Sequence, residues 1–307
     1  MAFLILTPNR NASKLVSKLK SMQPDIDIRV WPEVGEPSEI DFVVTWKHPP
    51  GELKKYPNLK AISSYGAGVD HLLKDPDLPD HIPITRIVDK KLVHDLKEFV
   101  IAVVLNHKRF LDAYKKNQSI KHWAPIPMNP KKTVGILGLG QIGSKIAEGF
   151  VHLDFHVCGW DRIPKPIQSV ECYQGNEQLD QLLSLVDYLI CSLPLTPLTK
   201  NILNSTTFNK LKRGAYIINI ARGDHLVEED LLKAIEDGQV SGACLDVFGT
   251  EPLPPDHPFW EHPKITITPH IAGITDPESV AVQLFENYQR VQKGVELLNT
   301  IDIQLGF

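Results

Sequence analysis

Short apolar runs alternate with amphipathic stretches along the first part of the chain. The runs predict strands over residues 3–6, 26–30, 42–46 and 59–63, and the apolar positions within 12–22 have helical spacing. A longer stretch over 92–105 places Leu92, Leu96, Phe99 and Val103 on one helical face. This alternation indicates a small α/β unit followed by a long helix.

From residue 133 onward the alternation of strand and helix becomes regular. Apolar runs predict strands over 134–137, 156–160, 188–192, 215–220, 242–247 and 265–268. Helices are predicted over 142–153, 179–185, 206–211, 228–237 and 278–293. Strands separated by helices form parallel, doubly wound sheets with right-handed crossovers.

The pattern predicts two lobes of the α/β class. A polar, proline-containing segment over 122–130 precedes the regular part, and the last helix can return to the first lobe. We expect a Rossmann-type doubly wound parallel-sheet domain that binds a dinucleotide over 99–274. The substrate domain is expected to be flavodoxin-like and discontinuous, over 1–98 and 275–307.

Composition narrows the class of protein further. Among 307 residues, 33 lysines and arginines stand against 37 aspartates and glutamates, which gives a net charge of −4. A nucleic-acid or membrane partner is therefore not expected, and no apolar run reaches the roughly 18 residues of a membrane span. The apolar start of the chain reads as a strand rather than a signal peptide. Four cysteines without C-x-x-C spacing predict reduced thiols, a cytoplasmic protein and no metal site.

A glycine-rich turn follows the predicted strand 134–137. Residues 138–143 read Gly-Leu-Gly-Gln-Ile-Gly, a G-x-G-x-x-G pattern between a strand and a helix. Gly138 permits the tight turn, Gly140 lets backbone amides approach a pyrophosphate, and Gly143 lets helix and strand pack closely. With Gln141 and Ile142 opening the helix, the turn predicts a dinucleotide site.

Residues after the predicted strand 156–160 bear on the type of nicotinamide cofactor. Asp161 follows this strand, where a carboxylate can hydrogen-bond the ribose hydroxyls of NAD(H). Arg162 comes next and Lys165 is near, and a cation there can hold the 2′-phosphate of NADP(H). The sequence favours NAD(H) and leaves both cofactors open.

Three further segments follow later strands: Asn219–Gly223, Leu245–Leu253 and Thr268–Gly273. Together with the glycine-rich turn they resemble the D-isomer-specific 2-hydroxyacid dehydrogenases, in order from about Trp46 to Ala272. The resemblance implies an NAD(P)-dependent oxidoreductase that reduces a small 2-oxo acid by hydride transfer. Within that family, the segments 46–50 and 251–255 look most like those of enzymes that reduce glyoxylate and hydroxypyruvate.

The resemblance implies roles for three residues. Arg222, in N-x-A-R-G, would bind the carboxylate and carbonyl of the substrate, and His270, in T-P-H, would be the acid/base with Glu251 as its partner. The residue types suit this chemistry, because a forked guanidinium grips two oxygens as lysine cannot. A carboxylate also stabilises the imidazolium that must give a proton to the ketone.

Further contacts are implied in the same way. The implied cofactor contacts beyond the glycine-rich turn, Asp161 and Arg162 are Leu193, Pro194, Thr196, Ile220, Ala221, Asp246 and Ala272. Asp246 would touch the nicotinamide carboxamide or, alternatively, hold a loop amide. The backbone N–H groups of Gly66, Ala67, Gly68 and Val69 would hold the substrate carboxylate. Trp46 either lines the substrate pocket or packs in the core.

Two alternatives for the function stay open. The substrate could be another D-2-hydroxy acid, since one methylene changes discrimination by only about 1–3 kcal/mol. A non-catalytic NAD(H)-binding regulatory protein is the second alternative, although the extra segments of such proteins have no counterpart after the helix over 278–293. A homodimer formed through the cofactor domain is expected from the resemblance alone.

Overall fold

A computed structural model describes residues 2–8, 10–163, 165–303 and 305–306. Their contacts divide the chain into two units, Met1–Leu92 with Thr275–Phe307, and Val93–Ile274. The sequence pattern places the first boundary a few residues later, at 98/99. Each unit holds one parallel sheet, of five and seven strands, which confirms the predicted α/β class. Within the described part of the chain, no helix is long and apolar enough to cross a membrane.

The first unit is built on a sheet with strand order β2-β1-β3-β4-β5. Its strands are β1 (Ala2–Leu6), β2 (Ile28–Val30), β3 (Ile40–Thr45), β4 (Ala61–Ser64) and β5 (Ile84–Thr85). Every residue of β1, β3 and β4 is buried. These strands lie at the centre of the sheet, which explains why their sequences are apolar runs rather than alternating patterns.

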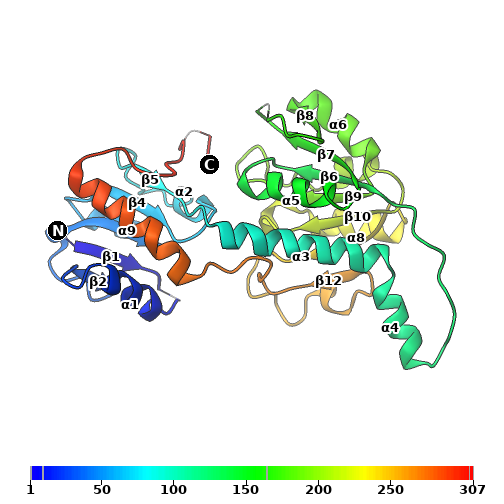
Figure 1. Cartoon of the computed structure of the whole chain (residues 1–307), viewed down its shortest axis with the longest axis horizontal. Helices are drawn as coiled ribbons and strands as arrows, with labels where there is room; N and C mark the ends of the chain where they lie inside the picture. Colours follow the sequence, from blue (N-terminus) through cyan, green and yellow to red (C-terminus); the bar gives the residue numbers. More distant parts are fainter. Residues whose placement is uncertain (1, 9, 164, 304, 307) are drawn as a thin grey trace. The chain divides into compact units, whose positions relative to one another are not determined.

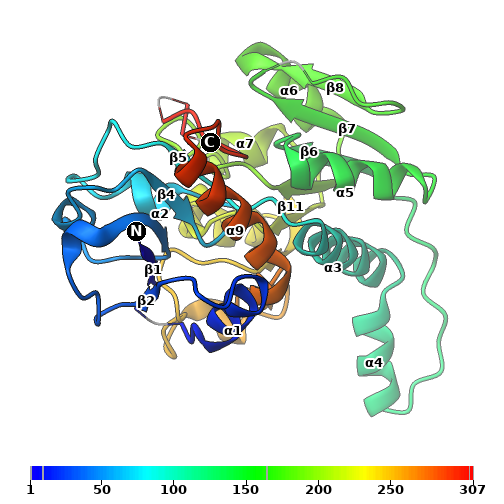
Figure 2. The same cartoon turned by 60° about the vertical axis from the view of Figure 1, so that its left-hand side comes forward.

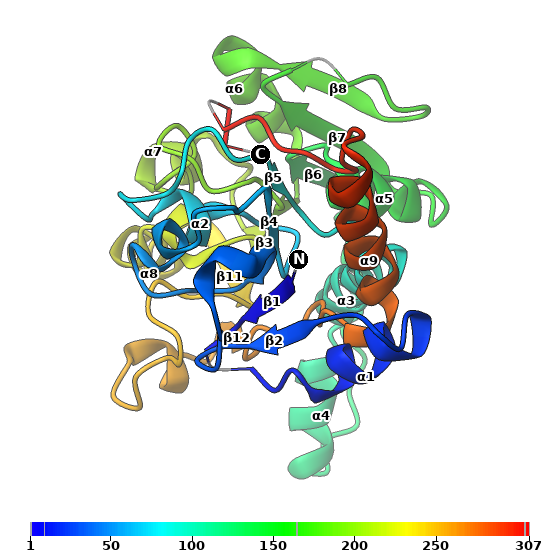
Figure 3. The same cartoon turned by 90° about the vertical axis from the view of Figure 1, so that its left-hand side faces the viewer.

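Two helices cover one face of this sheet. Figure 3 shows α1 (Ser13–Met22) and α9 (Pro277–Lys293) side by side there. The rings of Phe3, Phe42 and Tyr288 join β1, β3 and α9, with centroids 5.0 to 5.9 Å apart. The short helices η1 (Pro37–Glu39), η2 (Glu52–Lys55) and α2 (Asp70–Leu73) complete the unit. Because α9 comes from the far end of the sequence, this unit is discontinuous.

The second unit holds the sheet with order β12-β11-β10-β9-β6-β7-β8 (Figure 1). Its strands are β6 (Thr133–Leu137), β7 (His156–Asp161), β8 (Glu171–Gln174), β9 (Tyr188–Cys191), β10 (Ala215–Asn219), β11 (Val240–Leu245) and β12 (Ile265–Ile267). The order reverses between β6 and β9, so connections leave these neighbouring strands in opposite directions. Such a switch point is where open α/β sheets bind ligands.

Helices cover both faces of this sheet, and α4 (Leu111–Ser119) lies apart from it (Figure 2). The other helices are α3 (Lys90–Lys108), α5 (Gln141–Val151), α6 (Gly175–Leu185), α7 (Ser205–Lys210), η3 (Gly223–His225), α8 (Glu228–Glu236) and η4 (Pro258–Glu261). On one face, α6, α7 and α8 insert Leu182, Phe208 and Leu231 into a common core. Elsewhere α5 packs on α3, where a Cβ atom on Gly149 would lie 2.9 Å from Ile101.

Among the strands and α-helices, β5, β8, α2 and α4 were not predicted from the sequence, and the short helices η1 to η4 were not predicted either. β5 and α2 are only two and four residues long, whereas β8 and α4 have weak patterns. The edge strand β8 reads Glu-Cys-Tyr-Gln and has no buried residue, while α4 buries none of its side chains. Figure 2 shows α4 and its return segment lying apart from the sheet of their own unit. Trp123 in that segment is 100% exposed. Hydrophobic periodicity reports burial, so it cannot find elements that bury little.

One buried amide fixes the C-terminal segment of the first unit. Asn287 in α9 is fully buried, donates through Nδ2 to the Leu298 carbonyl at 3.1 Å and accepts from the Leu298 N–H at 2.8 Å. We expect Asn287→Ala to lower the free energy of unfolding by about 1–3 kcal/mol, because it leaves the backbone N–H and C=O groups of the half-buried Leu298 without these partners. Urea unfolding followed by circular dichroism measures this. The control Val282→Ala, at a side chain 52% exposed on the same helix, should change it by less than about 0.5 kcal/mol.

Candidate active site

The predicted site residues of the second unit all follow the carboxyl ends of its strands. The glycine-rich turn follows β6, Asp161 ends β7, Leu193 and Pro194 follow β9, and Arg222 follows β10. The segments with Glu251 and His270 follow β11 and β12. Because parallel strands all end at one edge of the sheet, this topology gathers the segments on that edge.

The glycine-rich turn is held by close backbone contacts. Gly138 has a φ of 94°, in the left-handed region, and its N–H donates to the Trp160 carbonyl at 2.8 Å. A Cβ atom on Gly143 would lie 1.8 Å from the Gly138 carbonyl oxygen. Ser192 at the end of β9 donates its hydroxyl to the same oxygen at 2.9 Å. No larger residue fits at position 143 while the strand, turn and helix keep this packing.

The start of α5 offers backbone donors beside open space. Within the described residues, the N–H groups of Gly140, Gln141, Ile142 and Gly143 find no acceptor. A Cβ atom on Gly140 would meet nothing within 4 Å. Unpaired N–H groups at a helix N-terminus attract anions. This cradle therefore fits the pyrophosphate of a dinucleotide.

Asp161 is tied to the turn by its side chain. It is only 8% exposed, and its Oδ2 atom accepts from the Leu139 N–H at 2.9 Å and from Lys165 Nζ at 3.0 Å. Its Oδ1 atom faces the Ile163 N–H at 3.4 Å. The carboxylate thus shapes the loop that follows β7. Lys165 compensates part of its charge.

The loop that carries Arg222 depends on two residues that the sequence analysis did not single out. Asn219, fully buried, accepts from the Ala221 N–H at 3.1 Å and donates to the Arg222 carbonyl at 2.9 Å. A Cβ atom on Gly223 would lie 1.9 Å from the Phe248 carbonyl carbon. Both residues belong to the N-x-A-R-G motif, so this motif was the sequence signal from which their importance could have been predicted. They fix the backbone on each side of Arg222.

His270 and Glu251 form a side-chain pair. The Nδ1 atom of His270 lies 3.1 and 3.0 Å from the two carboxylate oxygens of Glu251. This arrangement leaves Nε2 of the ring directed away from Glu251. The backbone of His270 has a φ of 55°, and a non-glycine residue held in this region costs about 1–3 kcal/mol. Such conformations persist only where surrounding contacts enforce them.

Asp246 supplies those contacts. It is 2% exposed, and its Oδ1 atom accepts from the Thr268 hydroxyl at 2.6 Å and the Ile271 N–H at 2.9 Å. Its Oδ2 atom accepts from the Ala272 N–H at 3.0 Å, and its carbonyl accepts from the His270 N–H at 2.9 Å. The residue therefore holds the turn of His270, which is the loop-holding alternative among its predicted roles.

His225 links the loops that follow β9 and β10, and Thr199 fixes the first of these loops. His225 is fully buried, and its Nδ1 and Nε2 atoms lie 3.2 and 3.3 Å from the carbonyl oxygens of Arg222 and Pro194. Thr196 donates its N–H to the Thr199 hydroxyl at 2.9 Å, and that hydroxyl donates to the Pro194 carbonyl. Leu193, Ile220 and Ala221 are largely buried beside these bonds.

The predicted substrate loop lies in the first unit, directly after β4. The N–H groups of Gly66, Ala67, Gly68 and Val69 meet no acceptor in the described ranges. Ser64 donates its hydroxyl to the Gly68 carbonyl at 2.8 Å, which fixes the curve of the loop. A Cβ atom on Gly66 would lie 2.4 Å from the indole of Trp46. Trp46 is partly buried, so it packs on the core and on this loop at once.

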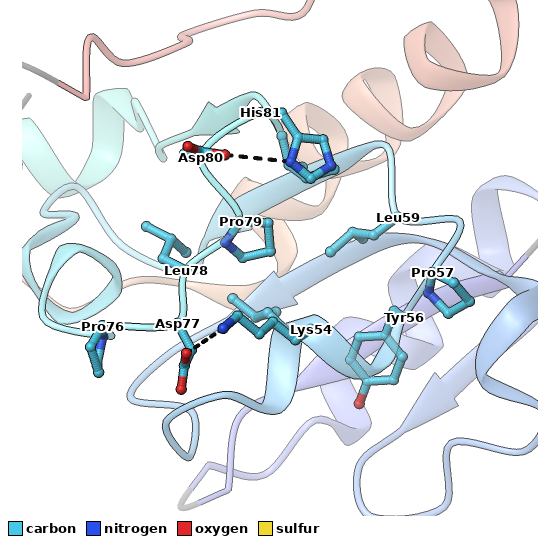
Figure 4. A pocket seen from close by; sticks show the side chains of 12 residues that line it. Lys54, Tyr56, Pro57, Leu59, Pro76, Asp77, Leu78, Pro79, Asp80 and His81 are labelled. Carbon is cyan, nitrogen blue, oxygen red and sulfur yellow. Dashed lines mark hydrogen bonds and ion pairs between the residues drawn. The ribbon is translucent and has the colours of Figure 1, made fainter.

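A hollow of about 400 Å³ in the first unit is not part of this site (Figure 4). Its lining comes from two segments, Leu53–Leu59 and Pro76–Ile82. These segments precede β4 and β5. The hollow therefore lies at the amino ends of the strands, whereas the substrate loop lies at the carboxyl ends.

Comparison with known proteins agrees with the geometry. The family model "D-isomer specific 2-hydroxyacid dehydrogenase, NAD binding domain" matches residues 101–272. A glyoxylate/hydroxypyruvate reductase A of Photorhabdus laumondii is 39% identical over the full length of both chains, as is one of Yersinia enterocolitica.

Solved structures are similar over the whole chain as well. A D-isomer specific 2-hydroxyacid dehydrogenase of Xanthobacter autotrophicus, in complex with NADPH and MES, is 34% identical with a TM-score of 0.95, covering 100% of this chain and 99% of that one. An NADPH-dependent glyoxylate/hydroxypyruvate reductase of Sinorhizobium meliloti, in complex with NADP and sulfate, is 34% identical with a TM-score of 0.93, covering both chains fully.

The glycine-rich turn yields a paired prediction. Gly143→Ala forces a methyl group onto the Gly138 carbonyl, so we expect a loss of about 1–3 kcal/mol in unfolding free energy. Gly140→Ala meets no protein atom and should unfold like the wild type, but should weaken binding of NADH and NADPH about 10- to 100-fold. Urea unfolding and fluorescence titration separate the two effects. Equal cofactor affinity in Gly140→Ala and the wild type would contradict the assignment of the cradle.

Proposed function

The chain belongs to the D-isomer specific 2-hydroxyacid dehydrogenase family, and we propose that it reduces glyoxylate, hydroxypyruvate or a similarly small 2-oxo acid to the 2-hydroxy acid. The family and its reaction class, NAD(P)-dependent oxidoreduction, are those predicted from the sequence. The substrate and the roles of individual residues are the proposal. The pairing of His270 with Glu251 at the carboxyl edge of the cofactor-domain sheet is the observation that carries it.

His270 acts as the proton donor in this proposal. Glu251 bonds Nδ1 of the ring, so the remaining nitrogen, Nε2, is the atom that gives a proton to the carbonyl oxygen. The carboxylate stabilises the imidazolium before that transfer and sets the ring orientation. In the opposite direction, the neutral ring takes the proton from the hydroxyl group. One proton is consumed for each carbonyl reduced.

Arg222 binds the carboxylate and carbonyl oxygens of the substrate in this proposal. Asn219 and Gly223 support the role, because they fix the backbone on both sides of the arginine. The free N–H groups of Gly66–Val69 support a separate role for that loop in holding a carboxylate. Fixing donors before the substrate arrives lowers the entropic cost of binding it.

The start of α5 holds the pyrophosphate of the cofactor. Bound NAD(P)H supplies the hydride that the carbonyl carbon receives. Leu193, Pro194, Thr196, Ile220, Ala221 and Ala272 line the groove for the rest of the cofactor. Asp246 keeps the His270 turn in place, and its carboxamide contact remains a proposal.

We propose that NADPH is accepted at least as well as NADH. Asp161 favours NADH by its position, but its carboxylate already accepts from Leu139 and Lys165. Arg162 and Lys165 provide positive charge for a 2′-phosphate. Similar proteins from Xanthobacter autotrophicus and Sinorhizobium meliloti have been solved in complex with NADPH and NADP, and these complexes support the proposal that NADPH is accepted.

Assembly and location complete the proposal. A homodimer is proposed from the family resemblance, and size-exclusion chromatography with light scattering tests it. A cytoplasmic location is proposed from the cysteine pattern. All four cysteines are free thiols and three of them are buried.

The acid/base assignment gives a direct test. We expect His270→Ala to lower kcat for glyoxylate and hydroxypyruvate about 10²- to 10⁴-fold. Glu251→Gln keeps an acceptor for the ring but removes the negative charge that stabilises the imidazolium, so kcat should fall about 10- to 100-fold. Initial rates of NADPH and NADH oxidation measure both effects.

A second histidine–glutamate pair provides the control. His257 Nε2 lies 3.0 Å from Glu228 in the same unit, and His257→Ala should keep kcat within about twofold. Near-normal reduction of glyoxylate or hydroxypyruvate by His270→Ala would contradict the role of His270 as proton donor. Tight NADPH binding without turnover of any 2-oxo acid would favour the regulatory alternative instead.

The cofactor proposal is tested at Lys165. Lys165→Met leaves the Asp161 charge uncompensated and removes a cation, so the ratio of kcat/KM for NADPH to that for NADH should fall about tenfold. Lys145→Met is the control, because Lys145 pairs with Glu148 on the exposed side of α5. An unchanged ratio in Lys165→Met would contradict a role in cofactor choice.

A further inference from the structure

A cation and two aromatic rings gather at the carboxyl edge of the first unit's sheet. Arg10 follows β1, Trp46 follows β3 and Tyr65 follows β4. The Trp46 N–H donates to the Leu6 carbonyl at 3.2 Å, and the Tyr65 N–H donates to the Thr45 carbonyl at 2.8 Å. The ends of these three strands are therefore held together, and the three side chains with them.

The guanidinium of Arg10 rests on aromatic faces. Its central carbon lies 4.5 Å from the ring centroid of Trp46 and 5.6 Å from that of Tyr65. Across the described chain, no carboxylate pairs with it. Two other arginines of this unit do pair with carboxylates: Arg29 with Asp27 and Glu39, and Arg290 with Glu286. The guanidinium of Arg10 is therefore fixed in position, and no carboxylate of the described residues pairs with its charge.

Tyr65 adds a neutral donor to this cluster. The residue is 6% exposed, and burial raises the pKa of its phenol to about 12, so the hydroxyl keeps its proton at neutral pH. The hydroxyl has no hydrogen-bond partner in the part of the chain that the structure describes. The acidic residue that acts on it, Asp276, accepts from the Glu278 N–H at 3.2 Å and caps α9.

The same indole joins this cluster to the substrate loop. Trp46 contacts Gly66, where a Cβ atom would lie 2.4 Å from the ring, and it also carries the Arg10 guanidinium. The Trp46 indole therefore lies between the N–H groups of Gly66–Val69, which can hold an anion, and the guanidinium of Arg10, which has no carboxylate partner in the described chain. A ligand with a second anionic group can reach both.

We propose that Arg10, with Trp46 and Tyr65, forms a subsite for a second anionic group at the far end of the 2-oxo acid, either a carboxylate or a phosphate. The proposal rests on the proposed function and deepens it by naming a substrate class. Glyoxylate and hydroxypyruvate leave this subsite unused. A 2-oxo dicarboxylic acid or a phosphorylated 2-oxo acid fills it, with Arg10 pairing its charge and Tyr65 donating a hydrogen bond.

The test compares 2-oxo acids that differ only at the far end. Hydroxypyruvate is paired with 3-phosphohydroxypyruvate, and 2-oxobutyrate with 2-oxosuccinate, and kcat/KM is measured for each with NADPH and NADH. We expect Arg10→Met to lower kcat/KM for the anionic member of a pair about 10- to 100-fold, mainly through KM, and to leave the neutral member within about twofold. The two pairs distinguish phosphate from carboxylate as the preferred group.

Matched variants keep the result interpretable. Arg10→Lys keeps the charge without the flat stacking group, so it should recover part of the loss, and it also serves if Arg10→Met does not fold. Lys14→Met removes a positive charge from an exposed site on α1 and should leave both members of each pair unchanged.

The outcomes separate the two proposals. No turnover of any 2-oxo acid by the wild type would overturn the proposed function itself. Turnover of the neutral acids, with the same ratio of anionic to neutral kcat/KM in the wild type, Arg10→Met and Arg10→Lys, would overturn the subsite alone. A fall in that ratio that Lys14→Met reproduces would reduce the effect to net charge and also overturn it.

Discussion

The common direction of the strands is the constraint on which both units depend. Every pairing between two named strands is parallel, so in the described chain the strands of each sheet end at one edge. Loops that follow strands far apart in sequence therefore meet there, which is how residues from 138 to 272 come to share one edge of the second unit. The Gly66–Val69 loop and the cluster of Arg10, Trp46 and Tyr65 meet at the carboxyl edge of the first unit's sheet for the same reason.

Close approach of backbone segments lets the carboxyl edge of the second unit's sheet hold hydrogen-bond donors in place for a ligand. Gly143 brings α5 against the turn after β6, and Gly223 brings the Arg222 loop against the Phe248 backbone. At each position a single methyl group would collide with backbone atoms that cannot move away cheaply. The loops can therefore hold donors in place before any ligand binds, and this lowers the entropic cost of binding.

Two carboxylates close to His270 have different roles because their surroundings differ. Asp246 is buried, and its oxygens accept three hydrogen bonds from the turn that carries His270. Glu251 is more exposed and faces the imidazole ring of His270. The carboxylate of Asp246 stabilises a strained backbone, and the carboxylate of Glu251 can stabilise the positive charge of a protonated His270. Burial and hydrogen bonding, rather than residue type, separate the two roles.

Periodicity and motif spacing in the sequence determined the α/β class, the strands with apolar runs, the glycine-rich turn and the family. These signals are local, because each reflects the burial of a short segment or the backbone needs of one turn. The tertiary structure decided what depends on distant contacts: the edge strand β8, the helix α4, the loop-holding work of Asp246 and Asn219, and the meeting of Arg10 with Trp46 and Tyr65. No sequence pattern marks Arg10, since its position follows from the packing of three strand ends that lie far apart along the chain.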